Sequence, residues 1–216
     1  MKLDKFSQDD FIKVSNRLVR SLTRGKSTSS QPKAILLGGQ SGAGKTTIHR
    51  IKQREFQGNI IVIDGDSYRS FHPNYLTLQE KYGKDSVDYT KVFAGQMVEY
   101  LVDELSKQGY HLLIEGTLRT TEVPRKTAQL LTTRDYQVSL ALIATKPELS
   151  YLSTLIRYEE LYAIEPSQAR ATPKAHHDGI VEHLVDNLQE LEKDKLFSQI
   201  QIYQRDQSCV YDSQVD

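Results

Sequence analysis

The sequence predicts an α/β fold in which a parallel sheet is flanked by helices. Short apolar segments recur along the chain with little alternation of polar and apolar residues, as expected of strands buried on both faces. Segments with helical periodicity lie between them, and this alternation is typical of a parallel sheet covered by helices. The expected strands are residues 34–37, 60–63, 112–114, 138–144 and 200–203.

An amphipathic helix is expected first, over residues 7–24. Its apolar residues recur at spacings of three and four and therefore share one face: Phe11, Val14, Leu18 and Leu22. Ser7 and Asp10 form the pattern of a capping box, with Asp in place of Glu. The polar stretch 25–32 ends in a proline and predicts a linker or an exposed loop. The helix either packs on the domain that follows it or binds a partner.

The other expected helices alternate with the strands and span residues 45–56, 90–107, 123–133, 147–163 and 173–194. Three of them have a proline near the start, where a missing N–H costs nothing: Pro124, Pro147 and Pro173. Gly109 follows the helix 90–107, as expected of a C-terminal cap.

Composition excludes several classes of protein. The chain has 216 residues with 28 basic and 28 acidic side chains, so it lacks the excess of cations that nucleic-acid binding requires. No apolar run approaches the roughly 20 residues that span a bilayer, and the first residues contain no apolar core of a signal peptide. Cys209 is the single cysteine, which excludes an internal disulfide and a cysteine zinc cluster. We therefore expect a cytoplasmic protein that binds neither membranes nor nucleic acids.

A phosphate-binding loop follows the first expected strand. Residues 39–46 match G-x-x-x-x-G-K-[ST] at every fixed position, and the motif begins an expected helix. Its glycines let successive backbone N–H groups turn toward an anion, and the helix N-terminus adds positive potential. We expect Lys45 to reach the β- and γ-phosphates and the Thr46 hydroxyl to ligate Mg²⁺. The motif predicts a P-loop protein that binds a nucleoside triphosphate.

Other P-loop classes fit the sequence less well than a kinase does. A switch GTPase needs an aspartate followed three residues later by glycine, and no aspartate of this chain has one. Thr145 begins a segment that resembles a guanine-binding motif, but Glu148 stands where that motif needs aspartate, so the segment predicts a helix start. A chain of this length leaves little room for a motor ATPase. A small-molecule kinase is therefore the leading interpretation.

Acidic residues follow two of the expected strands, at the sheet edge where ligands of open α/β proteins collect. Asp64 and Asp66 come after the strand 60–63, and Glu115 comes after the strand 112–114. We expect Asp66 to take the proton of an acceptor hydroxyl, and Asp64 to have a structural or magnesium-shell role. Glu115 is expected to hold magnesium, a water or acceptor hydroxyls, and the residues alone leave these roles open.

Two arginines flank the segment 158–169 and suit a transferring phosphoryl group, because a guanidinium contacts several oxygens at once. From their spacing alone, Arg157 and Arg170 fit either such a clamp or two solvated surface residues. His176, His177 and His183 lack a metal-binding spacing, and we expect them to be solvated or to cap a helix.

Several motifs together resemble the zeta toxin family of the bacterial epsilon/zeta toxin–antitoxin systems. They are residues 38–47, 64–67, 114–119, 156–160 and 169–173, in the family's order, and the resemblance covers nearly the whole chain. It implies a P-loop kinase that phosphorylates the 3′-hydroxyl of the amino sugar of UDP-N-acetylglucosamine with ATP and Mg²⁺. It also implies further helical sequence beyond residue 216.

The resemblance assigns roles to residues of this chain by their positions in the motifs. It implies that the catalytic residues are Asp66, Lys45, Arg157 and Arg170, with Thr46 at the metal. The residues implied for ATP binding are Gly39, Gln40, Ser41, Gly42, Ala43, Gly44, Lys45, Thr46 and Thr47. Those implied for the sugar nucleotide are Asp66, Glu99, Glu115, Thr117, Arg119 and Thr127. Residues 1–32 are then an N-terminal helix and linker, and residues 33–216 the kinase domain.

The family also implies a partner, an antitoxin protein that blocks the ATP site, and the helix 7–24 is a plausible docking surface for it. Two other functions stay open. One is a phosphotransferase of the chloramphenicol type, which has a similar fold and phosphate-binding loop. The other is a module that binds nucleotide without transfer, although such a module needs neither a base like Asp66 nor an arginine pair.

Overall fold

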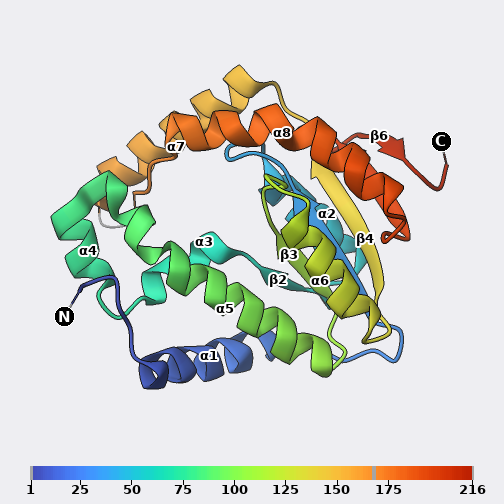
Figure 1. Ribbon diagram of the computed structural model, residues 1–216, viewed down its shortest axis with the longest axis horizontal. Helices are drawn as coiled ribbons and strands as arrows, with labels where there is room; N and C mark the ends of the chain where they lie inside the picture. The colour runs from blue at the N-terminus through green and yellow to red at the C-terminus, as the bar shows by residue number, and fades with distance from the viewer. Residues whose placement is uncertain (1, 167–168, 216) are drawn as a thin grey trace.

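A mixed sheet of six strands forms the centre of the protein, for which a computed structural model describes residues 2–166 and 169–215 (Figure 1). The strand order is β2-β3-β1-β4-β5-β6; the first five are parallel and β6 is antiparallel to β5. The strands are β1 (Lys33–Gly38), β2 (Ile61–Ile63), β3 (Leu112–Glu115), β4 (Gln137–Ile143), β5 (Gln199–Tyr203) and β6 (Cys209–Asp212). The predicted α/β class with a mainly parallel sheet is confirmed.

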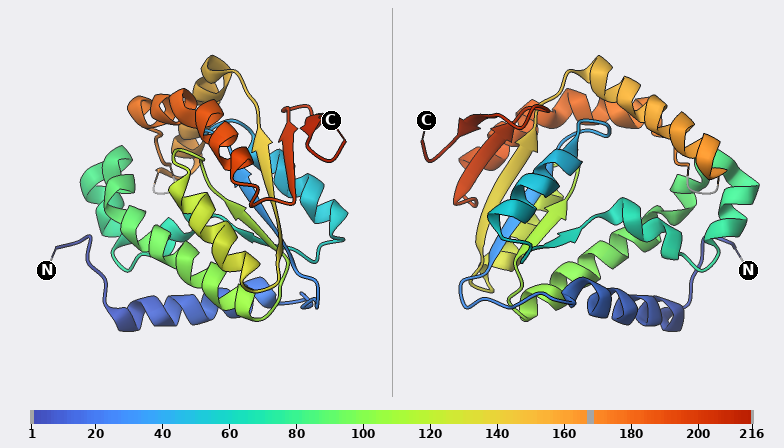
Figure 2. Two further views of the ribbon diagram at one scale, coloured as in Figure 1. Left: turned by 45° about the vertical axis from the view of Figure 1, so that its right-hand side comes forward. Right: turned by 180° about the vertical axis from the view of Figure 1, so that it is seen from behind.

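Helices cover both faces of the sheet, as Figures 1 and 2 show. α2 lies on one face, and α5, α6 and α8 lie on the other, while α7 runs beside α8 across one end of the molecule. The long helices are α1 (Gln8–Thr23), α2 (Lys45–Glu55), α5 (Val87–Lys107), α6 (Glu122–Thr132), α7 (Pro147–Ile164) and α8 (Lys174–Lys193). Each corresponds to an expected helix, with its ends shifted by three residues or fewer.

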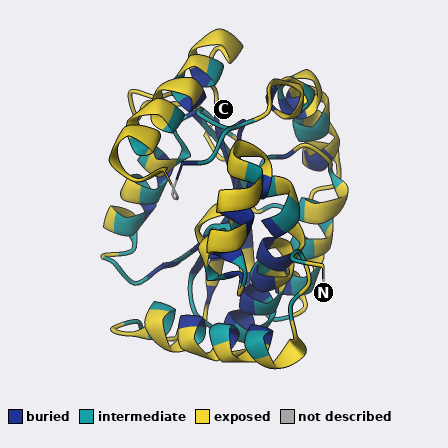
Figure 3. Ribbon diagram, turned by 90° about the vertical axis from the view of Figure 1, so that its left-hand side faces the viewer, coloured by how far each residue is buried: buried dark blue, intermediate teal, exposed yellow. Residues whose placement is uncertain are grey.

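Two apolar cores result from the alternation of side chains along the strands. In β1, Leu36 belongs to the core under α5, α6 and α8, whereas Ile35 and Leu37 pack with Ile48 of α2 on the other face. Burying each large aliphatic or aromatic side chain contributes about 1.5–3 kcal/mol. Figure 3 shows the same division in the helices, whose buried residues face inward and whose outer surfaces are exposed.

The N-terminal helix packs on the rest of the protein. Phe11 of α1 meets Phe93 of α5 edge-on with ring centroids 5.7 Å apart, and both belong to the larger core. The Ser7 hydroxyl accepts a hydrogen bond from the Asp10 N–H, which confirms the capping pattern. In the segment after α1, the Ser29 N–H donates to the Gly109 carbonyl at 2.9 Å. The division of the chain at residue 32 stays a prediction.

The structure contains elements that the sequence patterns did not predict. Between β2 and α5 lie two short α-helices and two 3₁₀ turns, and β6 follows β5 at the sheet edge. The new helices are α3 (Gly65–Tyr68) and α4 (Tyr75–Tyr82), and the turns are η1 (Arg69–Phe71) and η2 (Gly83–Ser86). Within the described part of the chain, no helix combines the length and the apolar character needed to cross a membrane.

Candidate active site

The phosphate-binding loop connects β1, near the middle of the sheet, to α2. Gly39, Gly42 and Gly44 adopt φ angles of 137°, 74° and 101°, a region that residues with a Cβ rarely enter. Lys45 folds back over the loop, and its ammonium donates to the Gly39 carbonyl at 2.9 Å and to the Gln40 carbonyl at 3.3 Å. The loop and the N-terminus of α2 thus form a site suited to an anion.

Glu115 lies next to the loop because β3 pairs directly with β1. Its carboxylate is 3.6 Å from the Lys45 ammonium and 2.8 Å from His49 Nε2. Desolvation raises the pKa of Glu115, but His49 and Lys45 outweigh it and hold the pKa below the ordinary value. A carboxylate is therefore kept ionised beside the loop lysine. His49, on α2, was not among the predicted site residues, although its position four residues after Lys45 places it on the same helix face.

Asp64 immediately precedes α3, and Asp66 lies in the first turn of that helix. Asp64 caps that helix, since its carboxylate accepts from the Asp66 N–H at 3.0 Å and from the Ser67 hydroxyl at 2.7 Å. Desolvation raises the pKa of Asp64, and the nearby carboxylates of Glu115 and Asp66 raise it further. Asp64 is therefore bound to the start of α3, which fits the structural one of the two roles expected for it, and the magnesium-shell role stays a prediction.

The Asp66 carboxylate is exposed to the cleft and bound to an arginine that the sequence did not reveal. Arg69 Nε donates to Asp66 Oδ1 at 2.7 Å, and Arg69 Nη1 donates to the Val87 carbonyl of α5 at 2.8 Å. Desolvation raises the pKa of Asp66, but Arg69, Arg170 and Lys45 outweigh it, so that the pKa is lowered. The spacing of three between Asp66 and Arg69 is visible in the sequence but becomes informative only once α3 and η1 are known.

A first cavity of about 620 Å³ brings together three of the four predicted catalytic residues, while Lys45 lies beside it, 3.6 Å from the lining residue Glu115. Thr46 of the loop, Asp66, Arg157 of α7 and Arg170 all line it, and Arg170 Nη1 donates to the Asp66 carbonyl. Of the segment between the two arginines, residues 167–168 lie outside the described part of the chain. The arrangement places a carboxylate and two guanidinium groups around the phosphate-binding loop.

The oxygen donors of this cavity fit a magnesium ion. The Thr46 hydroxyl and the carboxylates of Asp64, Asp66 and Glu115 all line it, and hard oxygen ligands are those that Mg²⁺ prefers. No cluster of three or more His, Cys, Asp or Glu side chains arranged around a metal position occurs among the described residues. The donor set therefore suits an ion that a bound nucleotide helps to hold.

A second cavity, of about 640 Å³, contains the other predicted acceptor residues. It lies between α5, α6 and the segment after β3, and its wall includes Glu99, Glu115, Thr117, Arg119 and Thr127. Glu115 and Arg119 line both cavities, so the two spaces meet at these side chains. The roles of these residues in substrate binding stay a prediction, but the structure places all five in one wall.

Leu118 gives the segment after β3 its shape. Its φ of 54° lies in the left-handed region, which costs a side chain with a Cβ roughly 1–2 kcal/mol. The Leu118 side chain occupies the space where a Cβ on Gly38 would stand, and Asn187 of α8 donates to the Leu118 carbonyl at 2.9 Å. The strained residue stands between Thr117 and Arg119, both of which line the second cavity.

The three histidines have different environments. His176 lines the first cavity and lies 3.5 Å from Arg119 Nη1, and His183 is exposed on α8. His177 is only 1% exposed and contacts the Ser150 hydroxyl, so the expectation of a solvated or capping residue is wrong for it. Its burial follows from the packing of α8 on α7, which the spacing of the histidines does not reveal.

Comparison with known proteins identifies the family. The Zeta toxin family model matches residues 18–216 of the chain. The chain belongs to the zeta toxin family. This zeta toxin is 70% identical over 213 residues to Toxin PezT of Streptococcus pneumoniae, a match that covers 99% of this chain and 84% of that protein. The predicted family is thus confirmed.

Solved structures agree with the architecture of this zeta toxin. A structure of the PezAT chromosomal toxin–antitoxin system of Streptococcus pneumoniae matches with a TM-score of 0.91 and 65% identity, covering 100% of this chain and 85% of that chain. A structure of the AvrRxo1-ORF1:-ORF2 complex with ATP matches with a TM-score of 0.58 and 14% identity, covering 97% of this chain and 65% of that chain. The second likeness supports the fold alone.

Proposed function

We propose that this zeta toxin is an ATP-dependent kinase that phosphorylates the 3′-hydroxyl of the amino sugar of UDP-N-acetylglucosamine and thereby blocks peptidoglycan synthesis. The junction of the two cavities supports the proposal. One cavity contains the phosphate-binding loop and Asp66, the other contains the residues that the family motifs assign to the sugar nucleotide, and Glu115 and Arg119 line both. An acceptor in the second cavity can therefore present a hydroxyl to a nucleotide in the first.

The transfer step follows from the charges of the first cavity. The acceptor hydroxyl oxygen attacks the γ-phosphorus, its proton passes to the Asp66 carboxylate, and the bond to the β-phosphate oxygen breaks to release ADP. Because its neighbours lower the pKa of Asp66, this carboxylate is ionised at neutral pH and able to accept the proton. Lys45, Arg157 and Arg170 stabilise the negative charge on the transferring group. Thr46 and Asp64 would hold Mg²⁺, which supplies charge neutralisation at the phosphates.

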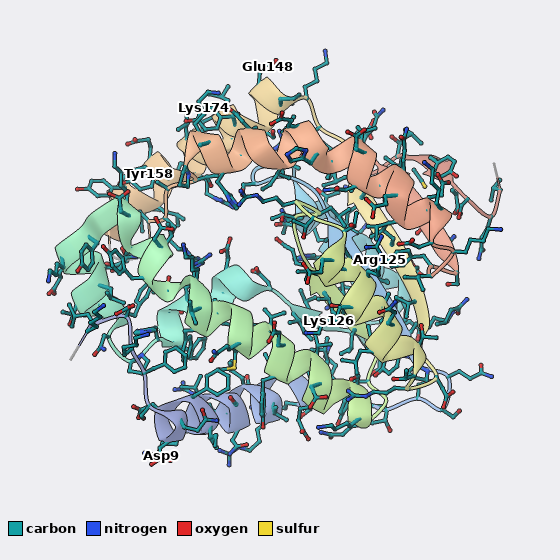
Figure 4. The ribbon with its side chains drawn as sticks, in the orientation of Figure 1. Asp9, Arg125, Lys126, Glu148, Tyr158 and Lys174 are labelled. Atoms are coloured by element: carbon teal, nitrogen blue, oxygen red, sulfur yellow. The ribbon has the colours of Figure 1, made fainter. Side chains whose placement is uncertain are left out.

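The proposal extends to the setting in which the enzyme acts. We place it in the cytoplasm, where its nucleotide substrates occur, and expect a cognate antitoxin protein as its partner. The similar structure from Streptococcus pneumoniae is of a toxin–antitoxin system, which supports this expectation. The outer face of α1, from which Asp9 projects (Figure 4), is available for such a partner, since its inner face packs on α5.

A coupled assay with Mg²⁺, ATP and UDP-N-acetylglucosamine tests the proposal. It measures ADP release and the gain of one phosphate on the sugar nucleotide, and compares the parent protein with Asp66→Asn. Asp9→Asn is the matched control, because it makes the same chemical change on the outer face of α1. We expect a phosphorylated product from the parent and the control, and a fall of about 10²–10⁴-fold with Asp66→Asn.

Other outcomes favour other functions. ADP release without a phosphorylated sugar nucleotide contradicts the acceptor and leads to antibiotics of the chloramphenicol type as the next acceptors. ATP binding without turnover on any of these acceptors supports a module that only binds nucleotide.

A further inference from the structure

Three buried polar side chains connect the phosphate-binding loop to α7 and α8. Gln40 of the loop, Ser150 of α7 and His177 of α8 are 2%, 0% and 1% exposed. Gln40 Nε2 donates to Ser150 Oγ at 3.2 Å and to the Thr145 carbonyl at 2.8 Å, and Ser150 Oγ lies 2.8 Å from His177 Nε2. We refer to Gln40, Ser150 and His177 together as the brace.

The hydrogen bonds of the brace meet at the Ser150 hydroxyl. This hydroxyl has two acceptors within reach, the Pro147 carbonyl at 2.9 Å and His177 Nε2 at 2.8 Å. The Asp178 carboxylate lies 3.2 Å from His177 Nδ1, which favours a proton on Nδ1 and leaves Nε2 able to accept from Ser150. Ser150 in turn accepts from Gln40. The order Asp178, His177 and Ser150 has the bonds of a hydrolase triad, but Ser150 is fully buried and cannot reach a substrate. The chain of bonds therefore holds three segments together and performs no nucleophilic chemistry.

The backbone of the phosphate-binding loop lies directly against α7 at Gly42. A Cβ added to Gly42 would stand 2.0 Å from the Ser150 carbonyl oxygen and 2.8 Å from Thr154 Cγ2. The loop and α7 therefore leave no space for a methyl group at Gly42, and the Gln40–Ser150 hydrogen bond joins the same two elements. Gln40 Nε2, Ser150 Oγ and His177 Nε2 have partners in this arrangement, whereas the buried Gln40 Oε1 has none. Moving α7 or α8 away from the loop would leave the other three atoms without partners as well, which is costly.

The elements joined by the brace also carry the two arginines of the first cavity. Ser150, Thr154 and Arg157 follow one another on α7 at spacings of four and three, so the side that touches the loop also presents Arg157. Arg170 lies four residues before α8, the helix that carries His177. A shift of α7 relative to the loop would therefore displace Arg157, and a shift of α8 would displace the segment that carries Arg170.

We propose that the brace of Gln40, Ser150 and His177 is a positioning network for phosphoryl transfer, which sets the distance between the phosphate-binding loop and the Arg157–Arg170 pair. The inference rests on the proposed kinase function. Displacing a catalytic group by about 1 Å can cost about 10²-fold in rate. Since no side chain of the brace lines either cavity, loss of Ser150 or His177 lowers kcat while ATP binding, through the loop and Lys45, persists.

The test compares Ser150→Ala with Ser15→Ala. Ser15 is an equally buried helical serine, 0% exposed, whose hydroxyl donates to the Phe11 carbonyl at 2.7 Å in α1, far from the loop along the chain. For each protein, kcat and the KM for ATP are measured by ADP release, and the Tm is measured by thermal unfolding. We expect kcat to fall about ten- to hundredfold with Ser150→Ala with the KM for ATP changed less than threefold, and to stay within twofold with Ser15→Ala.

A second pair of variants removes the histidine. His177→Gln keeps a polar group near the Nε2 position and His177→Leu does not, so we expect His177→Gln to retain at least fivefold more kcat. If Ser150→Ala fails to fold, the ratio of kcat between His177→Gln and His177→Leu tests the positioning role of the brace. A kcat for Ser150→Ala within twofold of that of the parent overturns the proposal, whether or not the KM for ATP rises. An equal fall in kcat for His177→Gln and His177→Leu overturns it too. Absence of turnover in the parent protein refutes the kinase function, and the inference that rests on it falls too.

Discussion

Gly42→Ala is the change whose cost the structure defines most sharply. Gly42 has a φ of 74°, and its added Cβ would overlap Ser150 of α7 at 2.0 Å. Gly58 has a φ of 81° and no atom within 4 Å of the same added Cβ. The two substitutions therefore share the backbone strain, and only Gly42→Ala adds a steric overlap.

The expected magnitudes follow from these two contributions. A left-handed φ costs a residue with a Cβ roughly 1–2 kcal/mol, and this is the whole expected effect of Gly58→Ala. Overpacking a tight contact adds about 1–3 kcal/mol, so Gly42→Ala should cost about 2–5 kcal/mol. Unfolding in urea gives the free energy of unfolding of each variant. An ATP titration gives the Kd for ATP, which rises if the loop changes its conformation to make room for the added methyl group.

One result would refute the reasoning. If Gly42→Ala is no less stable than Gly58→Ala and also binds ATP as the parent does, the loop and α7 do not meet as described. A loss of ATP binding without a loss of stability would show that the loop, rather than α7, moves to make room.

Three further predictions concern the site and the core. Arg69→Ala removes a cation that lowers the pKa of Asp66, so the acid limb of the kcat/KM profile should move to higher pH, measured by ADP release. Glu99→Gln and Thr127→Ala should each raise the KM for the acceptor about tenfold with the KM for ATP unchanged, because both residues line the second cavity only. Phe11→Ala should cost about 3–5 kcal/mol in a single urea transition, because α1 shares the core of the domain.

Each of these predictions has a contradicting result. An unchanged acid limb would mean that Arg69 does not act on the base. An equal rise in both KM values would place Glu99 and Thr127 at the nucleotide. A separate early transition for Phe11→Ala, with the main transition unmoved, would show that α1 unfolds apart from the domain.

The features that depend on local pattern were predictable from the sequence. The phosphate-binding loop, its strand and its helix follow from residues 38–47 alone, because the motif carries its own backbone requirements. The five parallel strands follow from short apolar segments, and α1 follows from the spacing of Phe11 and its neighbours. Family motifs then place Asp66 and Arg170 in one cavity although 104 positions separate them.

Features that depend on tertiary packing were not predictable in the same way. The strand order puts β3, and not β2, beside β1, which is why Glu115 lies nearer to the loop lysine than the chain order suggests. The short helices α3 and α4 have too few turns for a periodic pattern, and α3 depends on the cap from Asp64. The residues of β6 are exposed or half-buried without alternation, and its antiparallel pairing with β5 defines it as a strand.

The position of Glu115 in the wall of both cavities has a thermodynamic consequence. Its carboxylate lies 3.6 Å from the Lys45 ammonium. A nucleotide whose phosphates attract Lys45 therefore changes the electrostatic potential at Glu115, and so in the second cavity, where the acceptor is proposed to bind. Such an influence is necessarily mutual: the factor by which nucleotide changes the Kd of the acceptor equals the factor by which the acceptor changes the Kd of nucleotide. A protein that blocked the nucleotide site would thereby also change the affinity for the acceptor, without touching its cavity.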